Sequence, residues 1–273
     1  MQRRHVRAFQ KLVYRESAKA GRSFPWRNRA ATPYHILVSE YMLQQTQAPR
    51  AASFYRVFIK KFPSCRVLAR APFPEVLRLW QGLGYNRRTR FLHDASKIIA
   101  QRYGGAIPRS LDELVNLPGI GAYTAAAILA FAYNKPAICI ETNIRAVFIH
   151  HFFKHRKEGV RDKEILPLIK KTLDAKHPRL WYASLMDYGA RLKQHIPNPS
   201  RKSAGHTKQS RFLGSVRQMR GLILKMISAR PTREAALLAS FDISRRANAK
   251  LAIASLKKDR LLARKKSLLV VHE

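Results

Sequence analysis

The chain has 273 residues and carries 53 lysines and arginines against 16 aspartates and glutamates, a formal net charge of +37. This imbalance indicates a polyanionic partner, above all nucleic acid, whose affinity rests largely on phosphate neutralisation and counterion release. A hydrophobic content of 46% supports a packed core and argues against a ribosome-like structural protein, and no apolar run approaches the ~20 residues that a membrane-spanning helix needs.

The cysteine content and the N-terminus bear on compartment and cofactors. Two cysteines, Cys65 and Cys139, are too few for a disulfide framework or a four-thiolate cluster. We therefore expect reduced thiols, no metal and no cofactor. The basic N-terminus leads into no apolar segment of the kind that a signal peptide requires. These features predict a cytosolic protein, associated with the nucleoid if the source is bacterial.

Helical spacing covers most of the chain before about residue 220. Apolar residues recur at i, i+3 and i+4 in residues 36–44 and, across a proline-marked break, in residues 67–79. Residues 124–133 are alanine-rich and almost wholly apolar, which suits a helix buried on all sides. No regular strand alternation occurs before residue 260. The pattern predicts a mainly α fold.

The last quarter of the chain has a different pattern. Residues 195–211 are polar and basic, which predicts a loop. Three helices and two short strands are expected after it, at residues 216–226, 232–238 with Thr232 as its cap, 244–256 with Ser244 as its cap, 261–264 and 268–271. This order predicts a small winged-helix-like module over residues 216–273. Its basic residues have two interpretations, a DNA or protein contact and the solvated face of a packing appendage.

Residues 117–121 read Leu-Pro-Gly-Ile-Gly between two segments with helical spacing. Gly119 and Gly121 allow backbone conformations closed to other residues, and Leu117 and Ile120 can hold the flanking helices together. Backbone N–H groups at the start of the following helix can then face an anion such as a DNA phosphate. The alternative is an ordinary glycine-rich turn.

Two carboxylates lie in apolar surroundings. Glu40 is flanked by Leu37, Val38 and Met42, which predicts poor solvation and a raised pKa. Glu141 follows an apolar run. Two carboxylates in different environments suit cleavage of a glycosidic bond, in which one protonates the leaving group and the other stabilises the oxocarbenium ion. The alternatives are a glutamate on the wet edge of a helix for Glu40 and a helix-capping carboxylate for Glu141.

Several strings resemble the helix-hairpin-helix DNA glycosylases of the HhH-GPD type, and within them the MutY-type adenine DNA glycosylases. The likeness spans roughly residues 10–193 and implies a two-lobed helical fold. It rests on Phe24-Pro25-Trp26-Arg27, Ser39 to Gln47 (the most specific string), Gly82-Leu83-Gly84-Tyr85-Asn86-Arg87-Arg88, the hairpin from Leu117 to Thr124, and Met186-Asp187-Tyr188-Gly189-Ala190.

The resemblance implies catalytic roles. Glu40 would be the general acid that protonates the extruded adenine and would later take part in activating water. Glu141 would occupy the place of the family's catalytic aspartate, with Asn143 helping to hold it. Tyr123 stands where lyase-active relatives carry a nucleophilic lysine, which implies a monofunctional glycosylase without strong strand cleavage.

The resemblance also implies contacts with double-stranded DNA, by a protein that acts as a monomer and binds no membrane. Tyr85 and Gln45 would fill the stack around the extruded base, and Thr46 and Leu83 would lie near the opposite base. The remaining candidate contacts are Gln44, Arg87, Arg88, Gly119, Gly121, Thr124, and, in the basic loop, Lys208 and Arg211 together with His206.

Three departures from the family pattern are visible. The four cysteines of the family's iron–sulfur loop are absent, and Lys193 stands near the place of the first. Glutamate replaces aspartate at Glu141, which moves the carboxylate by about a bond length, and a ~1 Å misplacement can cost ~100-fold in rate. The module at residues 216–273 stands in place of the domain that recognises 8-oxoguanine in typical members.

The resemblance predicts a glycosylase domain over residues 1–215, with one lobe over about 25–135 and a second formed by 1–24 and 136–215, followed by the module at 216–273. The predicted function is excision of adenine mispaired with guanine or 8-oxoguanine in base excision repair. Two alternatives stay open. One is a mismatch glycosylase for thymine or uracil opposite guanine, and the other is a non-catalytic protein that binds damaged DNA.

Overall fold

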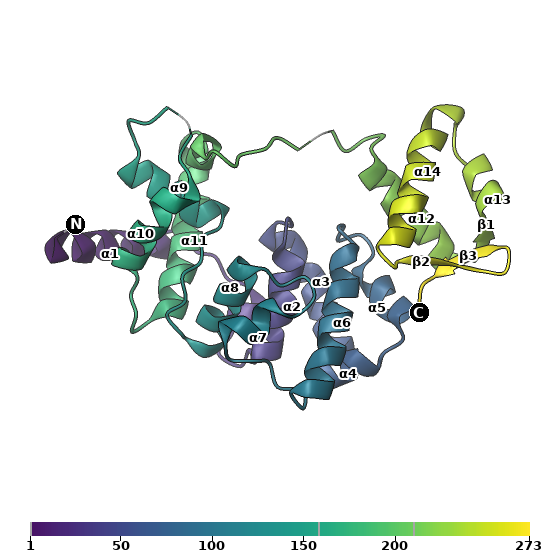
Figure 1. Cartoon of the computed structure of the whole chain (residues 1–273). Coiled ribbons are helices and arrows are strands. Elements are labelled where there is room, and N and C mark those ends of the chain that lie inside the picture. Colours follow the sequence, from purple (N-terminus) through teal and green to yellow (C-terminus); the bar gives the residue numbers. More distant parts are fainter. Residues whose placement is uncertain (1, 158, 210) are drawn as a thin grey trace. The chain divides into compact units, whose positions relative to one another are not determined.

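The computed structural model describes residues 2–157, 159–209 and 211–273, and its fold is mainly helical, as the periodicity predicted (Figure 1). The chain divides into two compact units. Unit 1 comprises Met1–Ile36, Pro108–Asn116 and Ile120–Lys208, and unit 2 comprises Leu37–Ile107, Leu117–Gly119 and Gln209–Glu273. Helix α2 (Pro33–Leu43) runs across the division. No helix in the described part is long and apolar enough to span a membrane.

The described residues of unit 1 form helices, their connections and one isolated parallel bridge between Val160 and Ser203. Its elements are α1 (Arg3–Ala18), the 3₁₀ turn η1 (Pro25–Arg27), α7 (Leu111–Val115), α8 (Ala122–Tyr133), α9 (Thr142–Phe152), α10 (Asp162–Thr172), α11 (Pro178–His195) and the 3₁₀ turn η2 (Pro199–Lys202).

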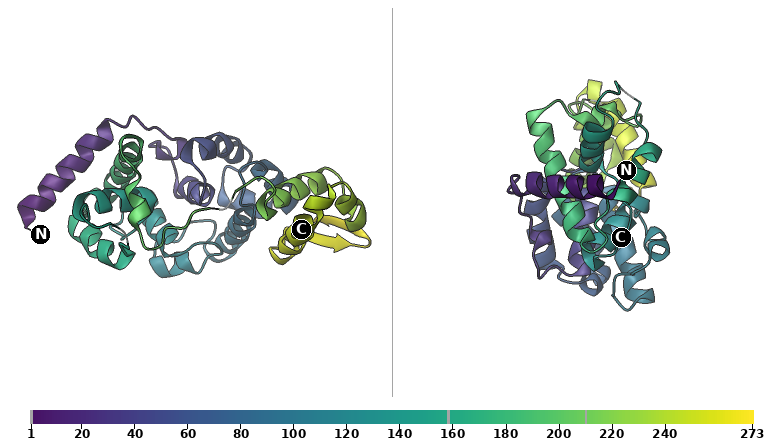
Figure 2. Two further views of the ribbon diagram at one scale, coloured as in Figure 1. Left: turned by 90° about the horizontal axis from the view of Figure 1, so that it is seen from above. Right: turned by 90° about the vertical axis from the view of Figure 1, so that its left-hand side faces the viewer.

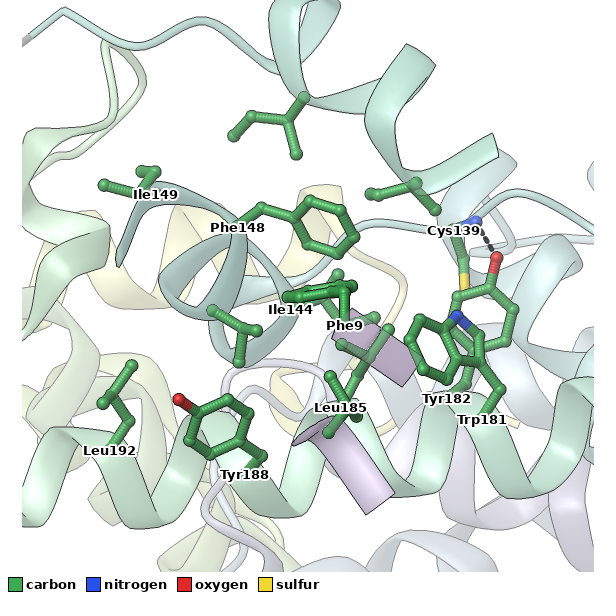
Figure 3. Packing of buried hydrophobic residues seen from close by; sticks show 14 of the residues in the cluster. Phe9, Cys139, Ile144, Phe148, Ile149, Trp181, Tyr182, Leu185, Tyr188 and Leu192 are labelled. Carbon is green, nitrogen blue, oxygen red and sulfur yellow. Dashed lines mark hydrogen bonds between the residues drawn. The ribbon is translucent and has the colours of Figure 1, made fainter. Parts of the chain in front are cut away.

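Aromatic side chains build the core of unit 1 (Figure 3). Phe148 and Trp181 are fully buried and both make edge-on contacts with Phe9 of α1, at ring-centroid distances of 5.5 and 6.1 Å. The hydroxyl of Tyr182 donates to the carbonyl of Ala137 at 2.7 Å, which satisfies the one polar atom of this buried ring. This core holds α9 and α11 together and so positions the start of α9.

Unit 2 joins helices from the middle of the chain to the C-terminal segment. Helices α3 (Ala48–Lys61), α4 (Cys65–Arg70), α5 (Phe73–Trp80) and α6 (Arg87–Arg102) are followed, much later in the chain, by α12 (Val216–Ala229), β1 (Thr232–Arg233), α13 (Glu234–Ala239), α14 (Ile243–Lys258), β2 (Leu262–Lys265) and β3 (Leu268–Val271). The three strands form an antiparallel sheet in the order β1-β3-β2, and its β2–β3 hairpin is drawn in yellow in Figures 1 and 2.

The C-terminal segment shares its core with α5. Phe73 and Leu77 belong to the same buried cluster as Met219 and Ile223 of α12 and Ile253 of α14. Separate cores would each be small, and burying α5 against α12 and α14 removes more apolar surface from water. Residues 216–273 are therefore packed onto the helical part of unit 2.

A buried arginine reinforces this packing. Arg90 of α6 is 6% exposed, and its guanidinium carbon lies 3.5 Å from the centroid of the Phe73 ring. The same guanidinium donates to the carbonyl of Arg260 at 2.8 and 3.1 Å and to that of His272 at 3.1 Å. Burial lowers the pKa of Arg90, and the carbonyl partners offset the cost of removing its charge from water.

Several expectations for the C-terminal region need correction. Helix α13 begins at Glu234 with Arg233 at its N-cap, and Thr232 lies in β1. Helix α14 begins at Ile243 with Asp242 at its N-cap, so Ser244 is inside the helix. Strand β1 itself was not predicted, because two residues are too few to show an alternating pattern. The hairpin of β2 and β3 is confirmed.

The predicted loop at residues 195–211 is only partly irregular. His195 ends α11, and η2 lies inside the segment, where the side chain of Asn198 accepts from the N–H of Ser200 at 3.0 Å. Ser210 of this predicted loop lies outside the described residues. The winged-helix assignment and the boundary at residue 215 stay predictions.

Candidate active site

Glu40 lies in α2 and is 6% exposed. The residues around it are fully buried, namely Leu37, Val38, Tyr41 and Met42. Helix α2 is therefore buried on several sides, as the even distribution of its apolar residues implies. The expectation that Glu40 sits in poorly solvated surroundings is confirmed by its burial, and a position on the wet edge of the helix is excluded. A buried carboxylate of this kind is suited to proton transfer.

The C-terminal end of α2 is attached to the hairpin. The hydroxyl of Tyr41 donates to the carbonyl of Pro118. The amide of Gln44, just after the helix, donates to the carbonyl of Gly119 at 3.1 Å. Gln44 was predicted to contact DNA, and in this structure its amide supports the backbone of the hairpin.

The hairpin bears out the glycine prediction at Gly119 but not at Gly121, whose φ of −92° is open to any residue and where a Cβ would meet nothing within 4 Å. Gly119 has φ of +76°, and a Cβ on it would lie 2.6 Å from the ring of Phe91, so both conformation and space require glycine. Leu117 and Ile120 are buried, and α8 begins at Ala122 with Gly121 as its N-cap. The N–H groups of the first turn of α8 follow directly, and Thr124 within that turn is 4% exposed.

Arg88 of α6 organises the loop ends around α2. It is 5% exposed, and its guanidinium donates to the carbonyls of Tyr41 at 3.0 Å, Met42 at 2.8 Å and Gly84 at 2.8 Å. It also donates to the hydroxyl of Thr46 at 3.0 Å. Burial lowers the pKa of Arg88 to about 10. The sequence marked Arg88 as a DNA contact, whereas here its donors face carbonyls of the protein.

The loop before α6 presents Tyr85. Its φ of +49° is rare for a residue with a side chain and marks a locally constrained backbone. The Tyr85 hydroxyl accepts from the amide of Gln209 at 2.6 Å and from Arg217 at 3.3 Å. Leu83 beside it is 4% exposed, so its side chain belongs to the core of unit 2. Gln45, with φ of +56°, is exposed.

Glu141 lies at the N-terminus of α9, and its capping role is real. One carboxylate oxygen accepts from the N–H of Asn143 at 2.7 Å and of Ile144 at 2.8 Å. The second oxygen accepts from the side-chain amide of Asn143 at 3.1 Å. Asn143 therefore does hold the carboxylate, as expected. Capping and chemistry are compatible, because the second oxygen keeps a free lone pair.

Burial raises the pKa of Glu141, and the two backbone N–H groups, Lys193 and Arg145 oppose that rise. Lys193 of α11 itself has a lowered pKa, caused first by burial and partly offset by Glu141. The residue that stands near the place of the missing cysteine therefore supplies positive charge to this carboxylate. This role of Lys193 had no signal in the local sequence.

Two arginines that the sequence left without a role hold α11. Arg27 donates to both carboxylate oxygens of Asp187, at 2.6 and 3.0 Å. Arg22 lies 3.1 Å from Asp187 and donates to the carbonyl of Met186 at 3.1 Å. The string that contains Phe24 and Arg27 is thereby joined to the string that contains Asp187, and a two-point ion pair of this kind fixes orientation.

Gly189 of α11 packs directly against the backbone of Asn143 in α9. A Cβ there would lie 2.2 Å from the backbone oxygen of Asn143, and backbone cannot rotate away. We predict that Gly189→Ala lowers the free energy of unfolding by roughly 1–3 kcal/mol through overpacking and displaces Glu141 and Asn143. Urea unfolding and the excision rate measure the two effects. Gly205→Ala, where a Cβ meets nothing within 4 Å, is the matched control; equal stability of the two variants would contradict the prediction.

The remaining candidates are distributed over both units. Tyr123 of α8 is partly buried against the core of unit 1. Arg87 is exposed, stacks over Phe91 at 4.7 Å and lies 3.4 Å from Asp259. Lys208 and Arg211 are exposed. These three cations are accessible to a polyanion.

The residues do not fit an iron–sulfur cluster. Such a cluster needs four thiolate ligands, and the chain has Cys65 and Cys139 alone. Both are buried in different units, and burial raises the pKa of Cys65 to about 11, which disfavours the thiolate that binds metal. Within the described residues, no group of three or more His, Cys, Asp or Glu side chains is arranged to hold a metal ion.

Known proteins are similar to this chain in sequence and in fold. The HhH-GPD superfamily of base excision DNA repair proteins matches residues 38–171. The adenine DNA glycosylase of Mycolicibacterium smegmatis is 34% identical over 225 residues, which cover 76% of each chain. That of Buchnera aphidicola subsp. Baizongia pistaciae is 36% identical over 173 residues, 62% of this chain and 48% of that protein. The chain thus spans about half the length of this second relative.

Solved structures agree on the fold. A thermostable thymine-DNA glycosylase matches with a TM-score of 0.59 and 25% identity, over 68% of this chain and 86% of that one. A trapped endonuclease III–DNA covalent intermediate matches with a TM-score of 0.59 and 18% identity, over 70% and 87% of the two chains. The chain therefore belongs to the HhH-GPD superfamily of base excision DNA repair proteins, and within it to the MutY-type adenine DNA glycosylases.

Proposed function

We propose that this protein is a monofunctional DNA glycosylase that removes adenine mispaired with guanine or 8-oxoguanine. The observation that carries the proposal is the similarity to a named adenine DNA glycosylase over 76% of both chains. The burial of Glu40 in α2, at the segment with the most specific resemblance, supports it. The formal charge of +37 is consistent with double-stranded DNA as the partner.

The proposed reaction is acid-catalysed hydrolysis of the N-glycosidic bond. Glu40 donates a proton to a ring nitrogen of adenine, the bond between base and sugar breaks, and the base leaves with the bonding electrons. Glu141 stabilises the resulting oxocarbenium ion through its negative charge. Water then attacks the sugar, and the Glu40 carboxylate takes up its proton, which leaves free adenine and an abasic site.

The proposed DNA contacts are divided into candidate side chains that are exposed and candidates that hold the exposed ones in place. Tyr85 and Gln45 surround the extruded base, and Thr46 lies near the opposite base. The N–H groups after Gly119 and Gly121 bind a phosphate. Arg87, Lys208 and Arg211 neutralise the backbone. Arg88, Gln44, Leu83 and Thr124, which are buried or occupied within the protein, contribute by holding these elements in place.

Single-turnover excision on labelled duplexes tests the proposal. Adenine is placed opposite 8-oxoguanine, guanine, cytosine and thymine, and each duplex is analysed with and without alkali. We expect abasic product from adenine opposite 8-oxoguanine or guanine, and strand breaks only after alkali, because Tyr123 offers no amine nucleophile. Breaks without alkali would contradict the monofunctional assignment.

A mismatch glycosylase for thymine or uracil opposite guanine is the second candidate. It is favoured by the 25% identity with the thermostable thymine-DNA glycosylase and by Glu141 at the place of the family's aspartate. Thymine–guanine and uracil–guanine duplexes run in the same assay decide between the two. Product from these pairs alone would move the specificity, and bound duplex without any product would indicate a damage-binding protein.

A further inference from the structure

Helix α14, which is labelled in Figure 1, has an exposed face with an unusual composition. Ile243 is 82% exposed and Leu251 is 59% exposed. The opposite face, formed by Ala249, Ala252, Ile253 and Leu256, is buried in the core that includes α12. The exposed residues of α14 are Ile243, Ser244, Arg245, Arg246, Ala247, Lys250, Leu251, Ala254 and Lys258.

This face carries positive charge only. Residues 216–273 contain fourteen lysines and arginines against four aspartates and glutamates. Glu234 pairs with Lys257 at 2.9 Å, and Asp259 pairs with Arg220 at 2.7 Å, so each of these two acids is neutralised by a basic partner. Asp242 precedes the helix and faces Arg245 at 3.8 Å. Arg246, Lys250 and Lys258 therefore dominate the field over the exposed face.

A second basic element lies at the turn between β2 and β3. Arg264, Lys265 and Lys266 are consecutive and exposed, and Lys266 adopts φ of +55° to close the turn. Like charges held next to one another repel at a cost in stability, and their concentration in a tight turn is readily explained by an anionic partner. The turn is joined by β2 and β3 to the sheet that packs beside α14.

The module is held rigidly enough to act as a binding surface. Buried Arg90 binds the carbonyls of Arg260 and His272, and Phe73 shares the core of α12 and α14. The amide of Gln81 donates to the hydroxyl of Ser228 at 2.7 Å. A contact made by α14 is therefore fixed relative to α5 and α6 of the same unit.

We propose that the exposed face of α14 and the β2–β3 turn form a second contact with duplex DNA, separate from the glycine hairpin at residues 117–121. Duplex DNA is favoured over a protein partner because both elements are basic and free of acids. Small Ser244, Ala247 and Ala254 between the cations let the helix approach a groove closely. Ile243 and Leu251 can meet thymine methyl groups there. The contact does not require a damaged base and does not depend on excision.

Charge reversal tests the helix contact. The double variant R246E/K250E is compared with K225E/R230E, which makes the same change in charge at exposed residues of α12 and its C-cap. Binding to an undamaged duplex of about 25 base pairs is measured by fluorescence anisotropy over a range of salt. We expect R246E/K250E to bind roughly 10–100-fold more weakly at about 0.1 M salt, with a slope of log K against log salt smaller by about two.

The turn is tested by K265E/K266E, for which a similar loss of affinity and slope is expected. Circular dichroism melting shows that each variant is folded. Wild-type affinity and slope in both test variants would overturn the proposal and assign the face to solvent or to a protein. Equal losses in K225E/R230E would also overturn it, because they would show an effect of net charge alone. The experiment measures binding to undamaged duplex, so its result is independent of whether the protein excises adenine.

Discussion

Replacing Glu40 with glutamine is expected to lower the single-turnover excision rate by about 10²–10⁴-fold, the usual contribution of a general acid. Glutamine has nearly the same shape and can accept and donate hydrogen bonds, but it cannot supply the proton that adenine needs to leave. Glu40 is 6% exposed and lies remote from bulk water, so solvent is a poor substitute for the lost acid. Duplex affinity should stay within about twofold, because one neutralised carboxylate adds no phosphate contact.

The matched control is Glu75→Gln, which makes the same chemical change in the same unit at a partly exposed residue paired with Lys61 at 2.8 Å. This variant should keep the full excision rate. Melting temperatures of both variants verify that the buried amide is tolerated. Undiminished excision by Glu40→Gln would remove Glu40 from the reaction and would direct the search for the acid to other residues.

The second large effect is expected for Glu141→Asp. Aspartate is a good N-cap residue and can still accept from the N–H groups at the start of α9, so stability should change little. The aspartate side chain is shorter by one methylene, however. In the wild-type protein the side-chain amide of Asn143 lies 3.1 Å from Oε2 of Glu141, a position that the aspartate carboxylate does not reach. A carboxylate misplaced by ~1 Å loses about 100-fold in rate.

Single-turnover rates at saturating enzyme measure this loss, and urea unfolding verifies the cap. Glu141→Gln is the companion variant, since it keeps the length and removes the charge that stabilises the sugar cation, and it should be slower than Glu141→Asp. An aspartate variant as fast as the wild type, or faster, would show that the backbone at α9 is not adapted to glutamate.

Local pattern was enough to predict the elements whose formation depends on near neighbours. The helix at residues 124–133 was visible as an alanine-rich apolar run, and α8 spans Ala122–Tyr133. The hairpin followed from Gly119, whose positive φ no side chain adopts easily. Burial of Glu40 followed from the apolar residues on every side of it in the sequence. The polyanionic partner likewise followed from charge and composition alone.

Residue type alone did not indicate the environment of several side chains. The sequence predicts DNA contacts for Arg88 and Leu83, which stay predictions, and the fold places Arg88 against backbone carbonyls and Leu83 in the core. A basic residue looks the same in sequence whether it faces solvent or buried carbonyls. The cap of α14 was misplaced by two residues because Asp242 and Ser244 are both good N-caps.

Residue chemistry and spacing thus determined the helical class, the hairpin, the pair of candidate carboxylates and the polyanionic partner, because each depends on a few consecutive residues. Long-range packing alone decided that Arg27 pairs with Asp187 and that no side chain fits at Gly189 against the backbone of Asn143. It also decided that the positive charge of Lys193 opposes the rise in the pKa of Glu141. It likewise decided that Arg90 fastens residues 260 and 272 to α6. These contacts join residues far apart in the chain, and their energies exist only once the intervening helices have packed.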